Sequence, residues 1–181
     1  MEKLIFEQLK NELVNGASKK GHPFRYFSLA TTNAANEPQL RTVVLRKVSQ
    51  ELELFFYTDY RSNKINQLVA NESVAALFYH SKKLMQVQIQ GKAEIVKDDA
   101  RIKSLWNGIP LNSRKDYTTI KAPGSSLKNS EEVDYLLEKN HFCVIKIVPA
   151  SIEYLRLQRP NHIRVRFNKK SNEWNGQFLV P

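Results

Sequence analysis

Positively charged and hydroxyl side chains gather in one short stretch of the sequence, and their types suit the binding of a phosphate. Arg41 begins one strand-like segment, and Tyr57 and Thr58 end the next. Arg61, Ser62 and Lys64 then stand at the start of a short helical pattern. Arginine and lysine bind phosphate through charge-assisted hydrogen bonds, and a helix start adds backbone N–H donors. The stretch therefore predicts an anion site, although solvated charges beside a strand and a helix cap explain the same spacing equally well.

Familiar catalytic and metal-binding patterns are absent from the sequence. The four histidines, His22, His80, His141 and His162, lack the short spacing of metal ligands, so no metal site is expected. The one cysteine, Cys143, lies in an apolar run, which favours a small core residue over a nucleophile. Neither a glycine-rich nucleotide loop nor a G-x-S-x-G elbow occurs. No side chain is therefore assigned a catalytic role.

Composition narrows the class of protein. The 181 residues include 28 Lys and Arg against 18 Asp and Glu, a formal net charge of +10. Hydrophobic residues make up 41%, enough for a core. No apolar run approaches the roughly 20 residues of a membrane span, and the first residues mix charges into their apolar positions, unlike a signal peptide. Together with the single cysteine, these features predict a cytoplasmic protein with one domain over 1–181 and no membrane partner.

Hydrophobic spacing predicts the elements that must position the charged residues. Helices are expected over 2–15 with a stop at Gly16, over 62–71, over 98–120 with a break at 108–110, and over 130–140. Strands are expected over 24–32, 39–48, 52–58, 73–80, 84–96, 141–148, 151–157, 162–167 and 173–180. Gly91 is expected to mark a bulge. Short connections favour an antiparallel meander at the start, and the whole pattern predicts an α+β fold around a closed or nearly closed antiparallel β-barrel, with a helical insertion over 98–140 and C-terminal strands over 141–181.

Three ordered blocks of the sequence resemble one known family. Residues 39–46 (QLRTVVLR), 55–64 (FFYTDYRSNK) and 85–91 (MQVQIQG) are similar to the pyridoxamine 5′-phosphate oxidase family. Its usual pattern is an R-x-V-L-L-K strand, an F-Y-T-N-x-x-S-R-K turn into a helix and an R-Q-V-x-x-x-G strand. The likeness resumes at 152–154, 162–167 and 173–181. Three blocks in order are a specific signal, where any one alone is weak.

The resemblance implies an FMN-binding split β-barrel homodimer with the flavin at the subunit interface. Carried over by position, it implies flavin contacts from Arg41, Thr42, Val43, Val44, Tyr57, Thr58, Ser62, Lys64, Gln86 and Arg166. Within this set Arg41 and Lys64 would bind the phosphate, and Gln86 would come from the other subunit. A small anionic substrate would be held by Arg46, His162 and Arg164.

Departures from the family pattern concern mainly the substrate half of the site. Arg46 stands where the family has lysine, and Asn63 where it has arginine. His162 and Arg164 exchange the order of the family's arginine and histidine, and Leu155 replaces a tryptophan. The FMN half is well matched.

Three functions are considered for a sequence with these features. The first is an FMN-dependent oxidoreductase that transfers a hydride to or from flavin N5, which needs no conspicuous acid or base in the protein. The second is an FMN-binding carrier or sensor without turnover. The third, a nucleic-acid binder, is least favoured because the Lys and Arg pairs stand isolated in turns rather than along one stripe.

Overall fold

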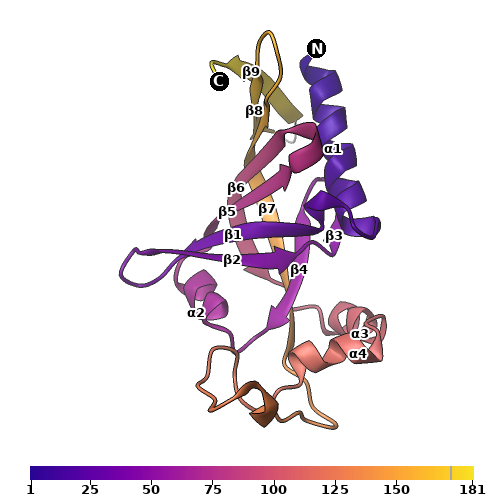
Figure 1. Cartoon of the computed structure of the whole chain (residues 1–181), viewed down its shortest axis with the longest axis vertical. Coiled ribbons are helices and arrows are strands. Elements are labelled where there is room, and N and C mark those ends of the chain that lie inside the picture. The colour runs from indigo at the N-terminus through magenta and orange to yellow at the C-terminus, as the bar shows by residue number, and fades with distance from the viewer. Residues whose placement is uncertain (172) are drawn as a thin grey trace.

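Nine antiparallel strands form one curled sheet in this computed structural model, which describes residues 1–171 and 173–181. The strands are β1 (Tyr26–Thr32), β2 (Pro38–Val44), β3 (Lys47–Val48), β4 (Leu54–Asp59), β5 (Ser73–His80), β6 (Met85–Ile95), β7 (Phe142–Arg156), β8 (Ile163–Lys170) and β9 (Glu173–Leu179). They lie in the order β2-β1-β5-β6-β7-β4-β3, and β8 pairs with β7 and β9. The curled sheet with its flanking helices (Figure 1) confirms the predicted class, an α+β antiparallel split β-barrel.

Helices flank the sheet at three places. Helix α1 (Glu2–Ser18) lies beside its upper part, and α2 (Asn63–Ala70) lies below β2. Two short helices, α3 (Asp99–Asn107) and α4 (Leu111–Arg114), lie at the lower right of Figure 1. None of the helices described here combines the length and apolar character that crossing a membrane requires.

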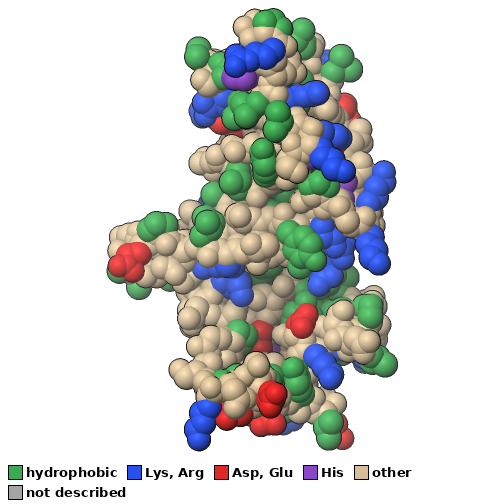
Figure 2. Space-filling model, viewed as in Figure 1, with side chains coloured by type: hydrophobic (Ala, Val, Ile, Leu, Met, Phe, Trp, Pro, Cys, Tyr) green, Lys and Arg blue, Asp and Glu red, His purple; other side chains and the backbone are tan. Residues whose placement is uncertain are grey.

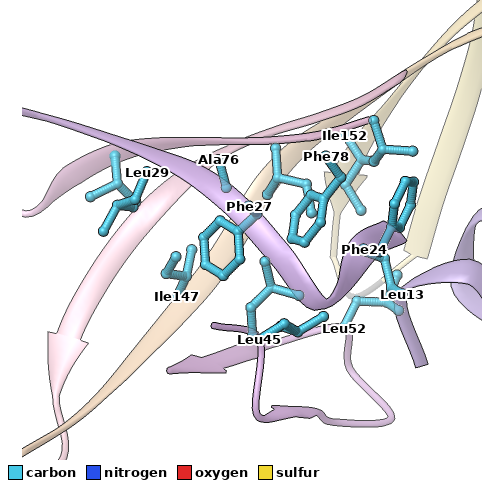
Figure 3. Packing of buried hydrophobic residues seen from close by; sticks show 14 of the residues in the cluster. Leu13, Phe24, Phe27, Leu29, Leu45, Leu52, Ala76, Phe78, Ile147 and Ile152 are labelled. Carbon is cyan, nitrogen blue, oxygen red and sulfur yellow. The ribbon is translucent and has the colours of Figure 1, made fainter. Parts of the chain in front are cut away.

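The main core lies between the curled sheet and α1. Leu13 of α1, Phe24 and Leu52 are buried together at one end of the sticks in Figure 3. Helix α1 continues past the stop predicted at Gly16, and this glycine packs against Phe24 rather than ending the helix. A Cβ at Gly16 would lie 2.7 Å from the Cβ of Phe24. The missing side chain therefore allows the helix and the segment before β1 to touch.

Strand β4 is buried on both faces. Its even-numbered residues, such as Phe56 and Thr58, face the barrel interior together with Cys143. Its odd-numbered residues, such as Phe55 and Tyr57, face a second apolar cluster. That cluster also contains Ile109, Tyr117, Phe142 and Val144, with Trp106 half-buried at its margin rather than fully buried. The segment after β6 thus packs against the outside of the barrel through β4.

The predicted meander forms only in part, and one predicted division of a strand was wrong. The strand predicted over 39–48 is divided into β2 and β3, and β3 makes a short hairpin with β4, which pairs over its whole length with β7 instead. The strands expected over 141–148 and 151–157 form one strand, β7, which passes through Pro149. Pro149 lies opposite Gly91 at an irregularity in the register. The bulge predicted at Gly91 is confirmed, and a Cβ there would lie 2.2 Å from the carbonyl oxygen of Val148.

The helix predicted over 130–140 was also wrong. Only one 3₁₀ turn forms there, at Ser130–Glu132. The backbone N–H of Leu136 donates to Thr118 at 2.6 Å, and Tyr135 forms a bridge with Thr119. Pairing with residues 118–119 thus supplies the backbone partners that a helix would have provided.

Candidate functional site

Arg41 is held with one edge of its guanidinium turned toward α2. Its Nη1 donates to Thr31 Oγ1 at 2.5 Å, and its Nη2 donates to Gln67 Oε1 at 2.9 Å. Thr31 Oγ1 itself donates to Gln67 Oε1 at 2.6 Å. Among the described residues, Arg41 Nε–H and the second N–H of Nη2 have no acceptor. These two groups form a fork that matches two oxygens of a carboxylate or phosphate.

Lys64 and two hydroxyls lie where β4 leads into α2. Lys64 Nζ donates to Thr58 Oγ1 at 2.9 Å, and Thr58 Oγ1 lies 3.3 Å from Ser62 Oγ. Ser62 occupies the N-cap position, as predicted, but its side chain makes no capping hydrogen bond to the helix. The hydroxyl therefore faces the lysine, and the first N–H groups of α2 lie beside it.

The two cations of this cradle (Arg41, Thr58, Ser62 and Lys64) lack an anionic partner. Within the described ranges, neither Arg41 nor Lys64 forms a salt bridge. Burial lowers the pKa of Arg41. Burial, and then the neighbouring charge of Arg41, lower the pKa of Lys64. Two half-buried cations that repel one another without a carboxylate form a site suited to an anion.

Arg61, which spacing alone also offers as a phosphate ligand, is engaged elsewhere. It forms a salt bridge to the buried Asp59, at 2.7 Å between Nη2 and Oδ2. It also donates to the carbonyls of Thr119 and Ile120, both at 2.8 Å, and of Lys121 at 3.4 Å. Arg61 therefore fastens the segment after α4 to the start of α2.

The remaining flavin residues predicted from β2 divide between the two faces of the sheet. Val43 is buried in the core, so only its backbone is offered to a ligand. Thr42 is exposed and Val44 is half-buried on the outer face. The strand order begins with β2, so one edge of its backbone has no neighbouring strand in the described sheet. Such an edge presents free N–H and C=O groups.

Gln86 and Arg166 lie on the same outer face but far along the sheet from β2. Two rows of cross-strand partners run across it: Thr42, Ser28, Leu77, Gln88, Glu153 and Arg166; and Val44, Tyr26 and, further along, Tyr79, Gln86, Leu155 and Arg164. With about 4.8 Å between strands, Gln86 lies roughly 14 Å and Arg166 roughly 24 Å from β2 along the sheet. Gln86 and Arg166 also point away from the barrel, whereas Arg41 points into it, so one copy of the chain does not direct these side chains to its own cradle.

The three residues predicted to hold a substrate are not brought together in one copy. The Arg46 guanidinium lies 5.5 Å from the centroid of the Tyr57 ring, and its buried Nε has no hydrogen-bond partner in the described part of the chain. Burial raises the pKa of Tyr57, and the charges of Arg46 and Arg101 act against that rise. His162 is exposed beside β8, and its Nδ1 accepts a hydrogen bond from the backbone of Gln158.

Arg164 lies on β8, two residues after His162, and is far from Arg46. It pairs with Leu155, whereas Arg46 bonds to Phe55 near the other end of β7, beside Lys146. The nine residue steps from 146 to 155 correspond to about 30 Å of strand. Arg46 on one side, and His162 with Arg164 on the other, thus form two separate groups.

Two histidines expected to be unrelated meet at α1. Ligand-type atoms of Glu12, His22 and His80 lie within 4.8 Å of one another. Each ring accepts a backbone hydrogen bond at Nδ1, from Phe24 to His22 and from Lys83 to His80. A neutral ring that accepts at Nδ1 carries its proton on Nε2, the reverse of what a metal bound at Nε2 requires. The cluster therefore suits an anchor for Glu12, which lies 3.2 Å from His22 and pairs with Lys83.

Sequence reasoning missed three residues that shape these groups: Thr31, Gln67 and Glu153. Thr31 reads as an ordinary strand residue and Gln67 as one polar position of a short helix. Both residues accept from Arg41, whose side chain points into the barrel. Because a buried arginine needs acceptors nearby, the inward position of Arg41 in its strand was the one signal that polar partners must lie close to it.

Comparison with known proteins agrees with the fold. Residues 4–97 match the family model of the FMN-binding domain of pyridoxamine 5′-phosphate oxidase. A pyridoxine/pyridoxamine 5′-phosphate oxidase of Cupriavidus taiwanensis is 31% identical over 164 residues, covering 84% of this chain and 76% of that protein.

Two solved structures share the fold. A pyridoxamine 5′-phosphate oxidase-related, FMN-binding protein of Nostoc punctiforme superposes with a TM-score of 0.81 at 20% identity, over 97% of both chains. PhzG of Burkholderia lata, solved with tetrahydrophenazine-1-carboxylic acid, gives 0.77 at 19% identity, over 99% of this chain and 91% of that one. By the family model and the Cupriavidus relative, the chain belongs to the pyridoxamine 5′-phosphate oxidase family.

Proposed function

We propose that the protein is an FMN-dependent oxidoreductase that works as a homodimer on a small anionic substrate. The observation that carries this proposal is the pair of half-buried cations, Arg41 and Lys64, without a carboxylate partner in the described chain. The donor set fits the phosphate of FMN: a free guanidinium fork, an ammonium, two hydroxyls and the N-terminus of α2. Bound FMN would supply the hydride chemistry at its N5 position.

The chain's own residues would bind and orient the cofactor. Arg41 and Lys64 hold the phosphate, with Ser62 and Thr58 as neutral donors. The free backbone edge of β2 at Thr42, Val43 and Val44 would donate to and accept from the flavin ring, and Tyr57 would line the site. Family membership supports FMN as the ligand.

A second copy would complete the flavin site. Gln86 and Arg166 lie roughly 14 and 24 Å from β2 along the sheet, so they would reach a flavin bound to the partner rather than their own. The outer face from β2 to β5 carries exposed Leu40, Tyr26 and Tyr79, which supports burial against another protein surface.

The substrate would be held by positive side chains from both copies. Arg46 would come from one subunit, and His162 and Arg164 from the other, which accounts for their separation in one chain. The relatives named as pyridoxine/pyridoxamine 5′-phosphate oxidases make pyridoxamine 5′-phosphate the first substrate to test. A single domain and a cytoplasmic location stay predictions.

Two measurements test this function. Purified protein should bind FMN with the visible absorption of oxidised flavin, and a protein that cannot be reconstituted with FMN would refute the proposal. Oxygen consumption with pyridoxamine 5′-phosphate, followed by a screen of anionic substrates, then measures turnover. FMN binding without any turnover would instead support the carrier or sensor.

A further inference from the structure

Glu153 of β7 holds two arginines of the neighbouring strand at once. Its Oε1 accepts from Arg164 Nε at 2.8 Å and lies 2.7 Å from Arg164 Nη2 in a salt bridge. Its Oε2 accepts from Arg166 Nε at 3.1 Å and Nη2 at 2.8 Å. The Glu153 side chain is only 12% exposed, whereas those of Arg164 and Arg166 are 34% and 48% exposed. A nearly buried carboxylate thus fixes two half-exposed cations.

The hydrogen bonds determine which edge each arginine presents. In both residues the fork formed by Nε and Nη2 points to Glu153. The other fork, formed by Nη1 and Nη2, makes no hydrogen bond to the described residues. Each guanidinium is planar, so fixing one edge also fixes the direction of the other. Arg164 and Arg166 therefore each present an unsatisfied donor edge, and Arg166 lines a small pocket together with Gln88 and Glu153.

The charge state of Glu153 agrees with this geometry. Burial by itself would raise the pKa of the carboxyl, but hydrogen bonds from Arg166 and Arg164 outweigh it, and the pKa is lowered. The carboxylate stays ionised near neutral pH. Two arginines and one carboxylate leave one excess positive charge on this part of the outer face.

We propose that Glu153 is a positioning residue that orients Arg164 and Arg166 toward the flavin and the anionic substrate of the partner subunit. The proposal rests on the function proposed above, which assigns Arg166 to the flavin and Arg164 to the substrate. Glu153 would thus support the binding of anions although it is itself negatively charged, because it acts through the two arginines and not by contact with a ligand.

The alternative is an ion pair that serves stability or merely offsets charge. The two ideas predict opposite signs for Glu153→Gln. Removing a negative charge beside an anion site tightens anion binding if charge alone matters. If position matters, the amide offers one acceptor oxygen in place of two, the arginines turn, and binding weakens.

The test is the FMN affinity of the folded homodimer, measured by flavin fluorescence quenching. We expect Glu153→Gln to weaken FMN binding about tenfold, roughly the loss of one well-placed charge-assisted hydrogen bond. Glu153→Asp keeps the charge but is one methylene shorter, so it should weaken binding by a smaller factor and should fold even where the glutamine variant does not. Glu94→Gln, which removes a salt-bridge partner of Lys146, is the matched control and should bind as the unaltered protein does.

The outcomes separate the two proposals. FMN binding by the unaltered protein and weaker binding by both Glu153 variants support the positioning role. Unchanged or tighter binding in either variant overturns that role and leaves the proposed function standing. Absence of FMN binding in the unaltered protein overturns both.

Discussion

Replacing Arg41 by methionine should separate the affinity for FMN from the stability of the fold. Methionine keeps much of the length of the side chain but removes the free fork of Nε–H and Nη2–H. Each hydrogen bond from a charged donor contributes about 1.5–3 kcal/mol. Loss of both costs about 3 kcal/mol at the low end of that range, so Kd for FMN should rise about 100-fold or more.

The stability of the protein without flavin should change much less. Methionine leaves Thr31 and Gln67 without the arginine, but those two remain hydrogen-bonded to one another. The substitution also removes a half-buried cation that lowers the pKa of Lys64. Since these effects oppose one another, the free energy of unfolding should stay within about 1 kcal/mol of its original value.

Stability and FMN binding should depend on pH in opposite directions, because of Lys64. The folded pKa of Lys64 lies below its ordinary value, so the unfolded chain binds more protons between the two values. Stability without FMN should therefore increase as pH rises through that window. FMN binding should weaken over the same window, because the ammonium loses its charge.

The assay combines flavin titration with urea unfolding. Arg25→Met is the control, since Arg25 is also half-buried but donates to a backbone carbonyl, that of Ala17, near the end of α1. A Kd for Arg41→Met within threefold of the original, in a folded protein, would refute the assignment of Arg41 to the phosphate. A loss of stability matching the loss of affinity would show that the arginine is structural.

Three further predictions follow from packing and burial. Burial raises the pKa of Cys143 to about 11, so at pH 8 the native protein should react with a thiol reagent only after unfolding; rapid native labelling would contradict its burial. Gly91→Ala should destabilise the protein by about 3 kcal/mol in urea unfolding, because its Cβ meets the carbonyl of Val148, whereas Gly108→Ala should change stability by less than about 0.5 kcal/mol. Arg61→Ala should speed tryptic cleavage after Lys121 several-fold while the barrel stays folded, and an unchanged cleavage rate would show that the arginine does not hold that segment.

Local patterns were sufficient for much of the fold. The alternation of Met85, Val87 and Ile89 with three glutamines is sufficient to predict both faces of β6, and the burial of the strand follows it. The bulge at Gly91 was also predictable, because a glycine inside a strand usually marks such a place. The pairing of β4 with β7 was not predictable, because the two segments lie more than eighty residues apart in the chain. Local sequence patterns do not specify which distant strand will be the neighbour.

The cradle could be predicted because its cations and hydroxyls lie close together in the chain, between β2 and α2. The second group could not be recognised as a unit. Arg164 and Arg166 alternate on β8 like any exposed strand residues, and their joint carboxylate lies on another strand. Figure 2 shows Lys and Arg side chains scattered from top to bottom of the drawn face, with uncharged surface between them. A net charge of +10 therefore does not locate the groups that act together.

The double burial of β4 places the cradle and the second apolar cluster on opposite faces of one strand. Thr58 and Tyr57 are neighbours in the chain, yet one faces the cradle and the other the aromatic cluster built with the segment after β6. Exchange of that segment for one of different shape alters the contacts of the odd-numbered face of β4 and of Arg61. The contacts among Arg41, Thr31 and Gln67, and between Lys64 and Thr58, involve no residue of that segment.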